Sequence, residues 1–373
     1  MANINDYLLW RGDLPISKVK FSEVDSMILA RFSYLLFNKI SMEKVETIES
    51  ISNKMKDFPN EEFRYNGDKE MIINLGNSRR FKNMLVTDFI EHTDKKAEKQ
   101  FSAITIHVSS SELYISYIGT DSTIVGWKED FNMAFMESVP AQEDGLKYLI
   151  NISKKYPDKN IRIGGHSKGG SVAIYSGLFS PKEIQDRIIK VYNYDGPGLR
   201  KATLDKITNP KILSKIHTYF PQDSIIGRIL EHREKCTVVQ STEKGIYQHD
   251  IFSWQVMRDN LVTLPALTYS SEIAYNTINN WMLSTTPEQK KMFFDGIFEL
   301  FYATDADTFA EMADSLSKNL PKFIKTYKGL SEESRNIIKS LLKEFGKASA
   351  NTIKSSEKPK LNPFGKTTKK DFA

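Results

Sequence analysis

One short segment limits the possible folds more than any other part of the chain. Residues 161–170 read Ile-Arg-Ile-Gly-Gly-His-Ser-Lys-Gly-Gly, which places Ser167 between Gly165 and Gly169 in a Gly-x-Ser-x-Gly pattern. The apolar residues before the pattern predict a strand, and the small residues after it predict a helix. In a tight strand-to-helix turn, the residues two positions before and after the serine must be small because neighbouring backbone passes close by. The pattern therefore predicts a nucleophilic Ser167 raised above a sheet edge.

The same turn predicts the donors of an oxyanion hole. The amide of Lys168 starts the predicted helix, where it can donate to a developing oxyanion. A second donor is expected from the loop at residues 117–122, Tyr-Ile-Gly-Thr-Asp-Ser, with Gly119 permitting an unusual backbone and Thr120 pointing inward. The alternative for this loop is an ordinary polar turn. The Lys168 side chain is expected to place a cation beside the pocket.

A nucleophilic serine needs a base, and three histidines follow Ser167 in the chain. His217 lies inside a predicted strand and is expected to be structural. His232 lies in a charged stretch that is predicted to be helical and solvated. His249 follows the last predicted strand, from which it can reach back over the sheet edge. We therefore predict His249 as the base.

The base needs an acid to orient it, and two aspartates compete for this role. Asp223 follows the predicted strand at 212–220 through a two-residue link, so it lies at the carboxyl end of a strand, where sites on parallel sheets are built. Asp195 ends the preceding strand and is the alternative. Asp223 is the preferred acid, and Asp195 is left to shape the turn or line the pocket.

Strands alternate with helices through the middle of the chain. This order predicts an α/β fold with a mainly parallel sheet and helices on both faces. Residues 1–262 are predicted to form this domain, with 1–100 partly a cap or support, followed by a helical extension at 263–350 and a basic flexible tail at 351–373. The predicted strands are 101–108, 113–118, 161–165, 190–194, 212–220 and 236–240, and the predicted helices include 21–37, 142–155 and 168–180, whereas 53–69 is expected to be loop or short helix.

Two helix boundaries in the extension carry clear signals. Thr286, followed by Pro287 and then Gln289, has the capping hydroxyl, the first-position proline and the third-position amide of a helix start. Ser331 is expected to cap a second helix, which Gly346 is expected to end. These helices are predicted to pack on the α/β domain or on each other.

Composition excludes several classes of protein. Apolar residues make up 40% and charged residues 27% of 373, which excludes wholesale disorder. The single cysteine, Cys236, excludes an internal disulfide and cysteine-based zinc or iron–sulfur sites. No run approaches the roughly 18 apolar residues of a membrane-spanning helix, and the first residues lack the basic region of a secretory signal. The cytoplasm is the expected compartment.

The distribution of charge is uneven. The net charge is +5, and residues 351–373 hold six lysines against two acidic residues, so the rest of the chain is nearly neutral. No basic stripe with interleaved aromatic residues is found, so we expect no nucleic-acid partner. The tail is expected to be a solvated end, and a weak contact with an anionic membrane surface is the alternative.

Taken together, these motifs resemble the α/β-hydrolase superfamily, and within it the class 3 lipases. That group combines a Gly-Thr/Ser oxyanion loop, a Trp-x-x-Asp segment, a Gly-His-Ser-x-Gly-Gly turn, an aspartate after a histidine-containing strand and a late histidine. Two positions depart from the pattern, with Ile118 in place of the usual arginine and Lys168 in place of an apolar residue. The matching residues are Gly119-Thr120, Trp127 to Asp130, Gly165 to Gly170, His217 with Asp223, and His249.

Two further segments look like the bacterial Mbeg1-like family, which is lipase-like. They are residues 6–13, Asp-Tyr-Leu-Leu-Trp-Arg-Gly-Asp, and residues 126–133, Gly-Trp-Lys-Glu-Asp-Phe-Asn-Met. The resemblance implies an α/β-hydrolase fold and a serine hydrolase of the lipase or esterase type, acting on a small-molecule or lipid acyl substrate. No metal or organic cofactor is required. The alternative is a non-catalytic binding or scaffold protein on the same fold.

Overall fold

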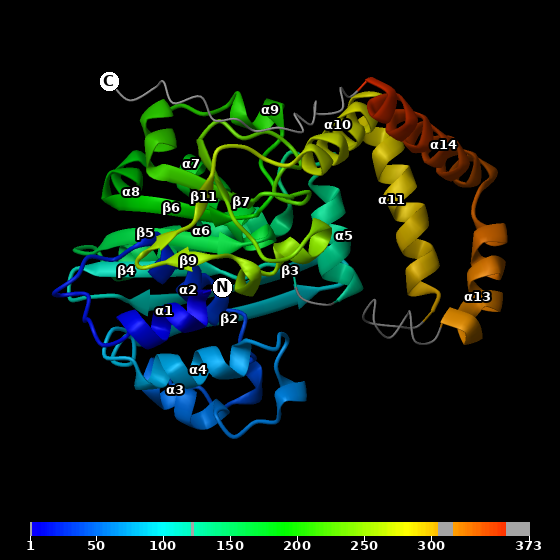
Figure 1. Cartoon of the computed structure of the whole chain (residues 1–373). Helices are drawn as coiled ribbons and strands as arrows, with labels where there is room; N and C mark the ends of the chain where they lie inside the picture. Colours follow the sequence, from blue (N-terminus) through cyan, green and yellow to red (C-terminus); the bar gives the residue numbers. More distant parts are fainter. Residues whose placement is uncertain (1, 121–122, 305–315, 356–373) are drawn as a thin grey trace, which may run out of the picture.

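A sheet of nine strands forms the centre of the protein in this computed structural model, which describes residues 2–120, 123–304 and 316–355 (Figure 1). The strand order is β1-β2-β3-β4-β5-β6-β7-β8-β11. Neighbours from β4 to β8 pair in parallel, and the pairs at both ends of the sheet are antiparallel. The bounds are β1 Val45–Thr47, β2 Leu85–Asp94, β3 Lys99–His107, β4 Glu112–Tyr117, β5 Asn160–His166, β6 Ile188–Tyr194, β7 Ile216–Pro221, β8 Lys235–Val239 and β11 Thr263–Leu264.

The predicted α/β fold with a mainly parallel sheet is confirmed, and its central strands lie where the apolar runs predicted them. The turn between β3 and β4 joins two antiparallel neighbours. One region differs from the predictions, because residues 212–215 belong to a 3-10 helix, η3 (Pro210–Lys215), that precedes β7. Residues 53–69, predicted to be loop or short helix, contain the end of α3 (Ile48–Met55) and the start of α4 (Asp68–Asn77).

Helices cover both faces of the sheet, and the alternation of side chains along β4 shows how. Tyr114 packs in a cluster with α2 (Glu23–Phe32), whereas Leu113 and Ile115 pack in a second cluster with α6 (Pro140–Lys155) and α7 (Lys168–Phe179). Successive side chains on a strand point to opposite faces, so the two clusters are the two halves of the core. The α2 helix is shorter than the predicted 21–37 helix, and η1 (Phe37–Lys39) follows it.

The remaining short elements lie at the sheet edges and in the connections. Helix α1 (Ile4–Arg11) begins with a capping box at Asn3, and it contacts α4 and α2. The others are η2 (Asn60–Glu62), α5 (Ile124–Asn132), α8 (Lys182–Arg187), α9 (Lys201–Leu204), η4 (Gly245–His249), η5 (Ile251–Ser253), β9 (Val256–Met257) and β10 (Asn260–Leu261).

The C-terminal helices stand beside the sheet (Figure 1). They are α10 (Tyr269–Leu283), α11 (Pro287–Tyr302), α13 (Leu316–Gly329) and α14 (Glu332–Ser355). Helix α11 packs on α5, and the C-terminal helices pack on one another. The capping box predicted at Thr286 is confirmed. The expectation that Gly346 ends a helix is wrong, because α14 continues through it; a glycine in a helix interior costs only about 1 kcal/mol. The apolar contacts with α5 form a cluster of Ile124, Trp281, Phe294, Phe298 and Leu341.

None of the helices in the described part of the chain has the length and apolar character to cross a membrane. Most of the predicted basic tail lies at residues 356–373, outside the described residues.

Candidate active site

Ser167 occupies a strained turn between β5 and α7. Its backbone has φ 57° and ψ −135°, a conformation that costs a non-glycine residue about 1–3 kcal/mol. The turn is possible only with glycines around it: a Cβ on Gly165 would lie 2.3 Å from the backbone of Gly169, and one on Gly169 would lie 2.2 Å from the carbonyl oxygen of Tyr117. The strand-turn-helix geometry predicted for Ser167 is therefore present, and the serine is partly exposed.

His249 lies on η4 and contacts Asp195 through its side chain. Its Nδ1 is 2.7 Å from Asp195 Oδ2, and the aspartate is almost fully buried. Because a carboxylate accepts hydrogen bonds, Nδ1 carries the proton of the neutral imidazole, which leaves Nε2 with its lone pair. Among the described residues, Nε2 has no hydrogen-bond partner. This is the tautomer that a general base requires.

The structure brings Asp195, and not Asp223, to the imidazole. Asp223 is bonded elsewhere: its Oδ2 accepts from the amide of Gly245 at 2.6 Å, and its Oδ1 accepts from the hydroxyls of Thr268 and Ser270. Burial raises the pKa of Asp223, but the hydrogen bonds from Ser270, Thr268 and Gly245 outweigh it and hold the pKa below its usual value. Asp223 thus anchors the start of η4, the element that carries His249.

A turn at the end of β6 aims Asp195 at His249. Asp195 has φ 50°, a left-handed conformation that aspartate tolerates better than most residues. Its amide donates to Tyr219 O at 2.9 Å, and its Oδ1 accepts from the Ser224 hydroxyl at 2.5 Å. The amide of Ser167 donates to Tyr194 O at 3.0 Å, so the turn of the serine and the turn of the acid are joined through one peptide unit.

His166 links the serine turn to the histidine loop, a contact that the sequence reasoning missed. Its Nε2 donates to the carbonyl oxygen of His249 at 2.7 Å, and the two rings lie 4.5 Å apart. Burial lowers the pKa of His166 well below its usual value, and the charge of the neighbouring His249 lowers it further, so this ring is neutral. The hydroxyl of Tyr34 donates to His166 O at 2.8 Å. No spacing signal in the sequence marks either residue.

The amide of Lys168 begins α7, where the first backbone N–H groups have no partner within the helix. Its side chain turns away from the site, against expectation. The Nζ donates to Glu129 Oε2 at 2.8 Å, to Gln100 O at 2.8 Å and to Gln100 Oε1 at 2.7 Å, and the side chain is 1% exposed. The expected cation beside the pocket is therefore absent at this position, because Glu129 holds the ammonium in the core.

Thr120 and Gly119 lie against the serine turn. A Cβ on Gly119 would be 2.6 Å from the backbone oxygen of His166 and 3.1 Å from Ser167 Cβ, so glycine is needed for the two loops to approach this closely. The Thr120 hydroxyl donates to Asp130, which is the last residue of the Trp127–Asp130 motif. Burial raises the pKa of Asp130 to about 6, partly offset by the charge of Lys168. Asp121 and Ser122 of the predicted loop lie outside the described residues.

The other two histidines differ in their surroundings. His217 lies on β7 with its Nε2 2.9 Å from the Thr237 hydroxyl, and burial lowers its pKa to about 4, so it has no base-like role at the site. The helical, solvated environment expected for His232 is wrong: it is in an extended segment, with Nδ1 2.7 Å from Glu234 and Nε2 2.7 Å from Gly227 O.

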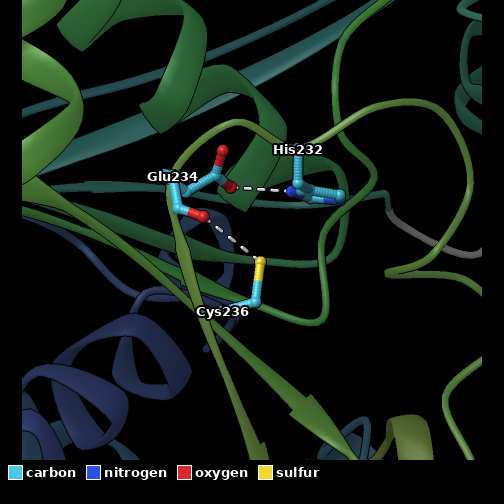
Figure 2. A group of neighbouring side chains, drawn as sticks. All are labelled: His232, Glu234 and Cys236. Carbon is cyan, nitrogen blue, oxygen red and sulfur yellow. Dashed lines mark hydrogen bonds and ion pairs between the residues drawn. The ribbon is translucent and has the colours of Figure 1, made fainter.

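Figure 2 shows His232, Glu234 and Cys236 converging on one side of this extended segment, close enough for their ligand atoms to approach a metal ion. The hydrogen bonds favour a different role. The carbonyl of Gly227 can only accept, so Nε2 of His232 carries a proton. Nδ1 of His232 is already in contact with the carboxylate of Glu234, so neither ring nitrogen is open to a metal ion. Burial and then the charge of Glu234 raise the pKa of the Cys236 thiol to about 12, so it is protonated at neutral pH. The hydrogen bond from His232 Nε2 holds the loop of Gly227, which lies so close to Asp195 that a Cβ on Gly227 would be 2.3 Å from Asp195 Oδ1.

Comparison with known protein families identifies the family of this chain. The profile of the Mbeg1-like family matches residues 75–299, more than half of the chain. The chain belongs to the Mbeg1-like family. The resemblance seen in the sequence is thereby confirmed, and the parallel sheet with Ser167 at the β5–α7 turn is an α/β-hydrolase fold.

The solved structures that this Mbeg1-like protein resembles include two lipases and a mutant form of MDLA. The Lip2 lipase from Yarrowia lipolytica is 14% identical with a TM-score of 0.31, over 46% of this chain and 68% of that one. Lipase II from Rhizopus niveus is 13% identical with a TM-score of 0.31, over 42% and 67%. A mutant form of MDLA from Penicillium cyclopium is 12% identical with a TM-score of 0.38, over 66% and 87%. No curated protein matches the chain.

Proposed function

We propose that this Mbeg1-like protein is a serine hydrolase that cleaves a carboxylic ester or a related acyl bond. The observation that carries the proposal is the 2.7 Å contact between His249 Nδ1 and the buried Asp195, at the same sheet edge as the strained turn of Ser167. A serine hydroxyl is a weak nucleophile at neutral pH unless a base takes its proton. An imidazole oriented by a carboxylate, at the sheet edge where the serine is raised, would meet that requirement once its Nε2 reaches the serine hydroxyl.

In the proposed reaction, the hydroxyl oxygen of Ser167 attacks the acyl carbon while Nε2 of His249 takes its proton. The imidazolium is stabilised by Asp195 and gives the proton to the leaving alcohol, which leaves an acyl-enzyme. Water then attacks the acyl carbon, again giving a proton to His249, and the acid product and the free serine are released. Every proton taken by the base is returned, so the cycle needs no other reactant than water.

The developing oxyanion is assigned to the amides of Lys168 and Thr120. The first lies at the N-terminus of α7, where the helix dipole adds to the effect of the hydrogen bond. The second is supported by the hydrogen bond from the Thr120 hydroxyl to Asp130, which fixes the loop. Each donor of this kind lowers the barrier by about 3–4 kcal/mol in hydrolases where one was removed.

The test is labelling of the full chain with a fluorophosphonate probe, with Ser167→Ala as the matched variant. We expect labelling of the intact protein and none of the variant, together with hydrolysis of p-nitrophenyl esters that the variant lacks. If the folded intact protein neither reacts with the probe nor hydrolyses any ester of a chain-length series, with or without liposomes, the catalytic proposal fails. The non-catalytic binding alternative would then stand.

A further inference from the structure

A cavity whose lining does not include Ser167 is formed by residues of α10, of α9 and of the segment 225–231. Figure 1 shows where α9 and α10 lie. The volume of the cavity is about 380 Å³, within the roughly 300–1,000 Å³ of ordinary small-molecule sites. The C-terminal helices form one wall and the α/β domain forms the other. Apolar side chains and cations line it together, among them Leu199, Ile229, Ile278 and Met282 with Arg200 and Lys290.

Lys290 is the unusual member of this lining. It is 8% exposed, and its ammonium makes no hydrogen bond or ion pair with any residue that the structure describes, whereas its backbone amide donates to Thr286 O at 3.0 Å. Lysines this little exposed are normally paired, whereas the Lys290 ammonium is open only to the cavity and is not among the fully buried polar atoms. Burial lowers the pKa of Lys290, and the charge of the nearby Arg200 lowers it further. The nearby charge that acts on Lys290 is therefore another cation.

Arg200 also lacks an acidic partner among the described residues. Its Nη1 donates to the carbonyl oxygen of Phe135 at 2.6 Å, which leaves most of its donors available. The other two cations in the lining are paired, Arg228 with Glu272 at 2.6 Å and Lys201 with Asp205 at 3.4 Å. Two neighbouring cations without an acidic partner thus face a cavity whose other walls combine apolar side chains with polar ones, including Glu231 and Asn279.

We propose that this cavity binds an amphiphilic anion, with a carboxylate or phosphate head between Lys290 and Arg200 and an apolar body against Leu199, Ile278 and Met282. An anionic head supplies the charge that these two cations lack, and hydrogen bonds to charged groups are the strong kind. The apolar walls select a ligand with a hydrocarbon portion over a free inorganic ion, because its burial adds favourable transfer energy.

The site is separate from the triad but shares a segment with it. Ser224 donates to Asp195 on the triad side, whereas the next residue, Ile225, lines the cavity. Gly227 lies against Asp195, and Arg228 again lines the cavity. The proposal does not depend on catalysis at Ser167, so it is tested by binding and by stability.

The binding test uses decanoate, decyl phosphate, decanol and inorganic phosphate with the full chain, measured by calorimetry. We expect decanoate or decyl phosphate to bind at least about tenfold more tightly than decanol or inorganic phosphate. Comparison of the two amphiphiles then separates a carboxylate site from a phosphate site. Equal binding of decanol, or inorganic phosphate that binds as tightly as decyl phosphate, would overturn the proposal.

Two variants assign binding to this cavity. Lys290→Met and Arg200→Gln should each weaken binding of the preferred amphiphile by about tenfold or more. Lys291→Gln is the matched control, because Lys291 is the next residue of α11 and pairs with Asp295 at 2.5 Å outside the cavity, so its affinity should equal that of the unmodified chain. Undiminished binding by both cavity variants, or an equal loss in the control, would place the ligand elsewhere.

A stability readout separates the site from a purely structural lysine. Without ligand, Lys290→Met should unfold at a higher temperature than the unmodified chain, because it removes an uncompensated buried charge beside Arg200. At one ligand concentration, the ligand should raise the unfolding temperature of the unmodified chain by more than it raises that of Lys290→Met. A lower unfolding temperature for the ligand-free variant, at every pH, would show that Lys290 stabilises the fold by itself and would overturn the proposal.

Discussion

Asp195 and Asp223 both support His249, but they do so through different atoms. Asp195 contacts the imidazole itself, and Asp223 holds the backbone at Gly245, four residues earlier. An acid at the imidazole stabilises the charged form of the base, whereas an acid at the backbone only positions the loop. The two roles predict very different losses on substitution.

We expect Asp195→Asn to lower kcat for a p-nitrophenyl ester by about 10⁴-fold, the size of the effect in serine proteases, because an amide cannot hold the same tautomer of His249. Asp223→Asn should stay within about tenfold of the unmodified chain, since an asparagine oxygen can still accept from Gly245. Steady-state kinetics with Ser167→Ala as the zero-activity reference checks both. If Asp223→Asn gives the larger loss, Asp223 is the acid.

The carboxyl group of Asp130 should make the stability of the protein depend on pH. Its pKa is raised by burial from 3.8 to about 6, so the folded state favours the protonated acid. A carboxyl whose pKa is raised on folding contributes stability at pH below 3.8 that is lost as the pH rises through about 6. Asp130→Asn keeps an acceptor for Thr120 without this charge. We therefore expect its unfolding temperature, relative to the unmodified chain, to rise between pH 4 and about 6 and then level off. A flat difference across that range would contradict the assignment.

At the scale of elements, the β5–α7 turn places the Ser167 hydroxyl at a cost in the stability of the folded state. The positive φ of Ser167 is strained for any residue with a Cβ. Ser167→Gly should therefore have a free energy of unfolding about 1–3 kcal/mol above that of Ser167→Ala, with neither variant active. At Ser171, inside α7, the order should reverse, because glycine is about 1 kcal/mol worse than alanine in a helix. Urea unfolding of the four variants measures both differences. If the alanine variant is the more stable one at both positions, the turn at Ser167 is unstrained.

The elements also show how far the sequence can predict this site. Apolar runs locate β3 to β8, and the glycine spacing locates Ser167, because both are set by local chemistry. The choice between Asp195 and Asp223 is not local, since both follow strands at the same sheet edge. It is decided by the left-handed turn of Asp195 and by Thr268, which lies 45 residues from Asp223 and holds its carboxylate. The buried pair of Lys168 and Glu129 is likewise a tertiary contact that no spacing marks.

At the scale of the whole molecule, the C-terminal helices connect to the site through α5. Helix α5 carries Glu129, which holds Lys168, and Asp130, which holds Thr120. Phe131 of the same helix packs on Phe294 of α11 with ring centroids 4.8 Å apart. The extension is thus joined to the oxyanion loop by one shared helix. Leu300, further along α11, packs instead with Leu330 and Ile338 and has no part in the α5 cluster.

This arrangement predicts that two core truncations on α11 differ in activity more than in stability. Phe294→Ala and Leu300→Ala should each lower the free energy of unfolding by about 2–5 kcal/mol, because both remove buried apolar volume. Only Phe294→Ala leaves a space beside α5, so it should also lower kcat/KM for esters by about tenfold, since small displacements of positioning groups are costly in catalysis. Urea unfolding and steady-state kinetics on the two variants, both assayed well below their unfolding temperatures, measure the two effects. Equal kcat/KM values at matched loss of stability would show that the extension supports the fold without positioning the oxyanion loop.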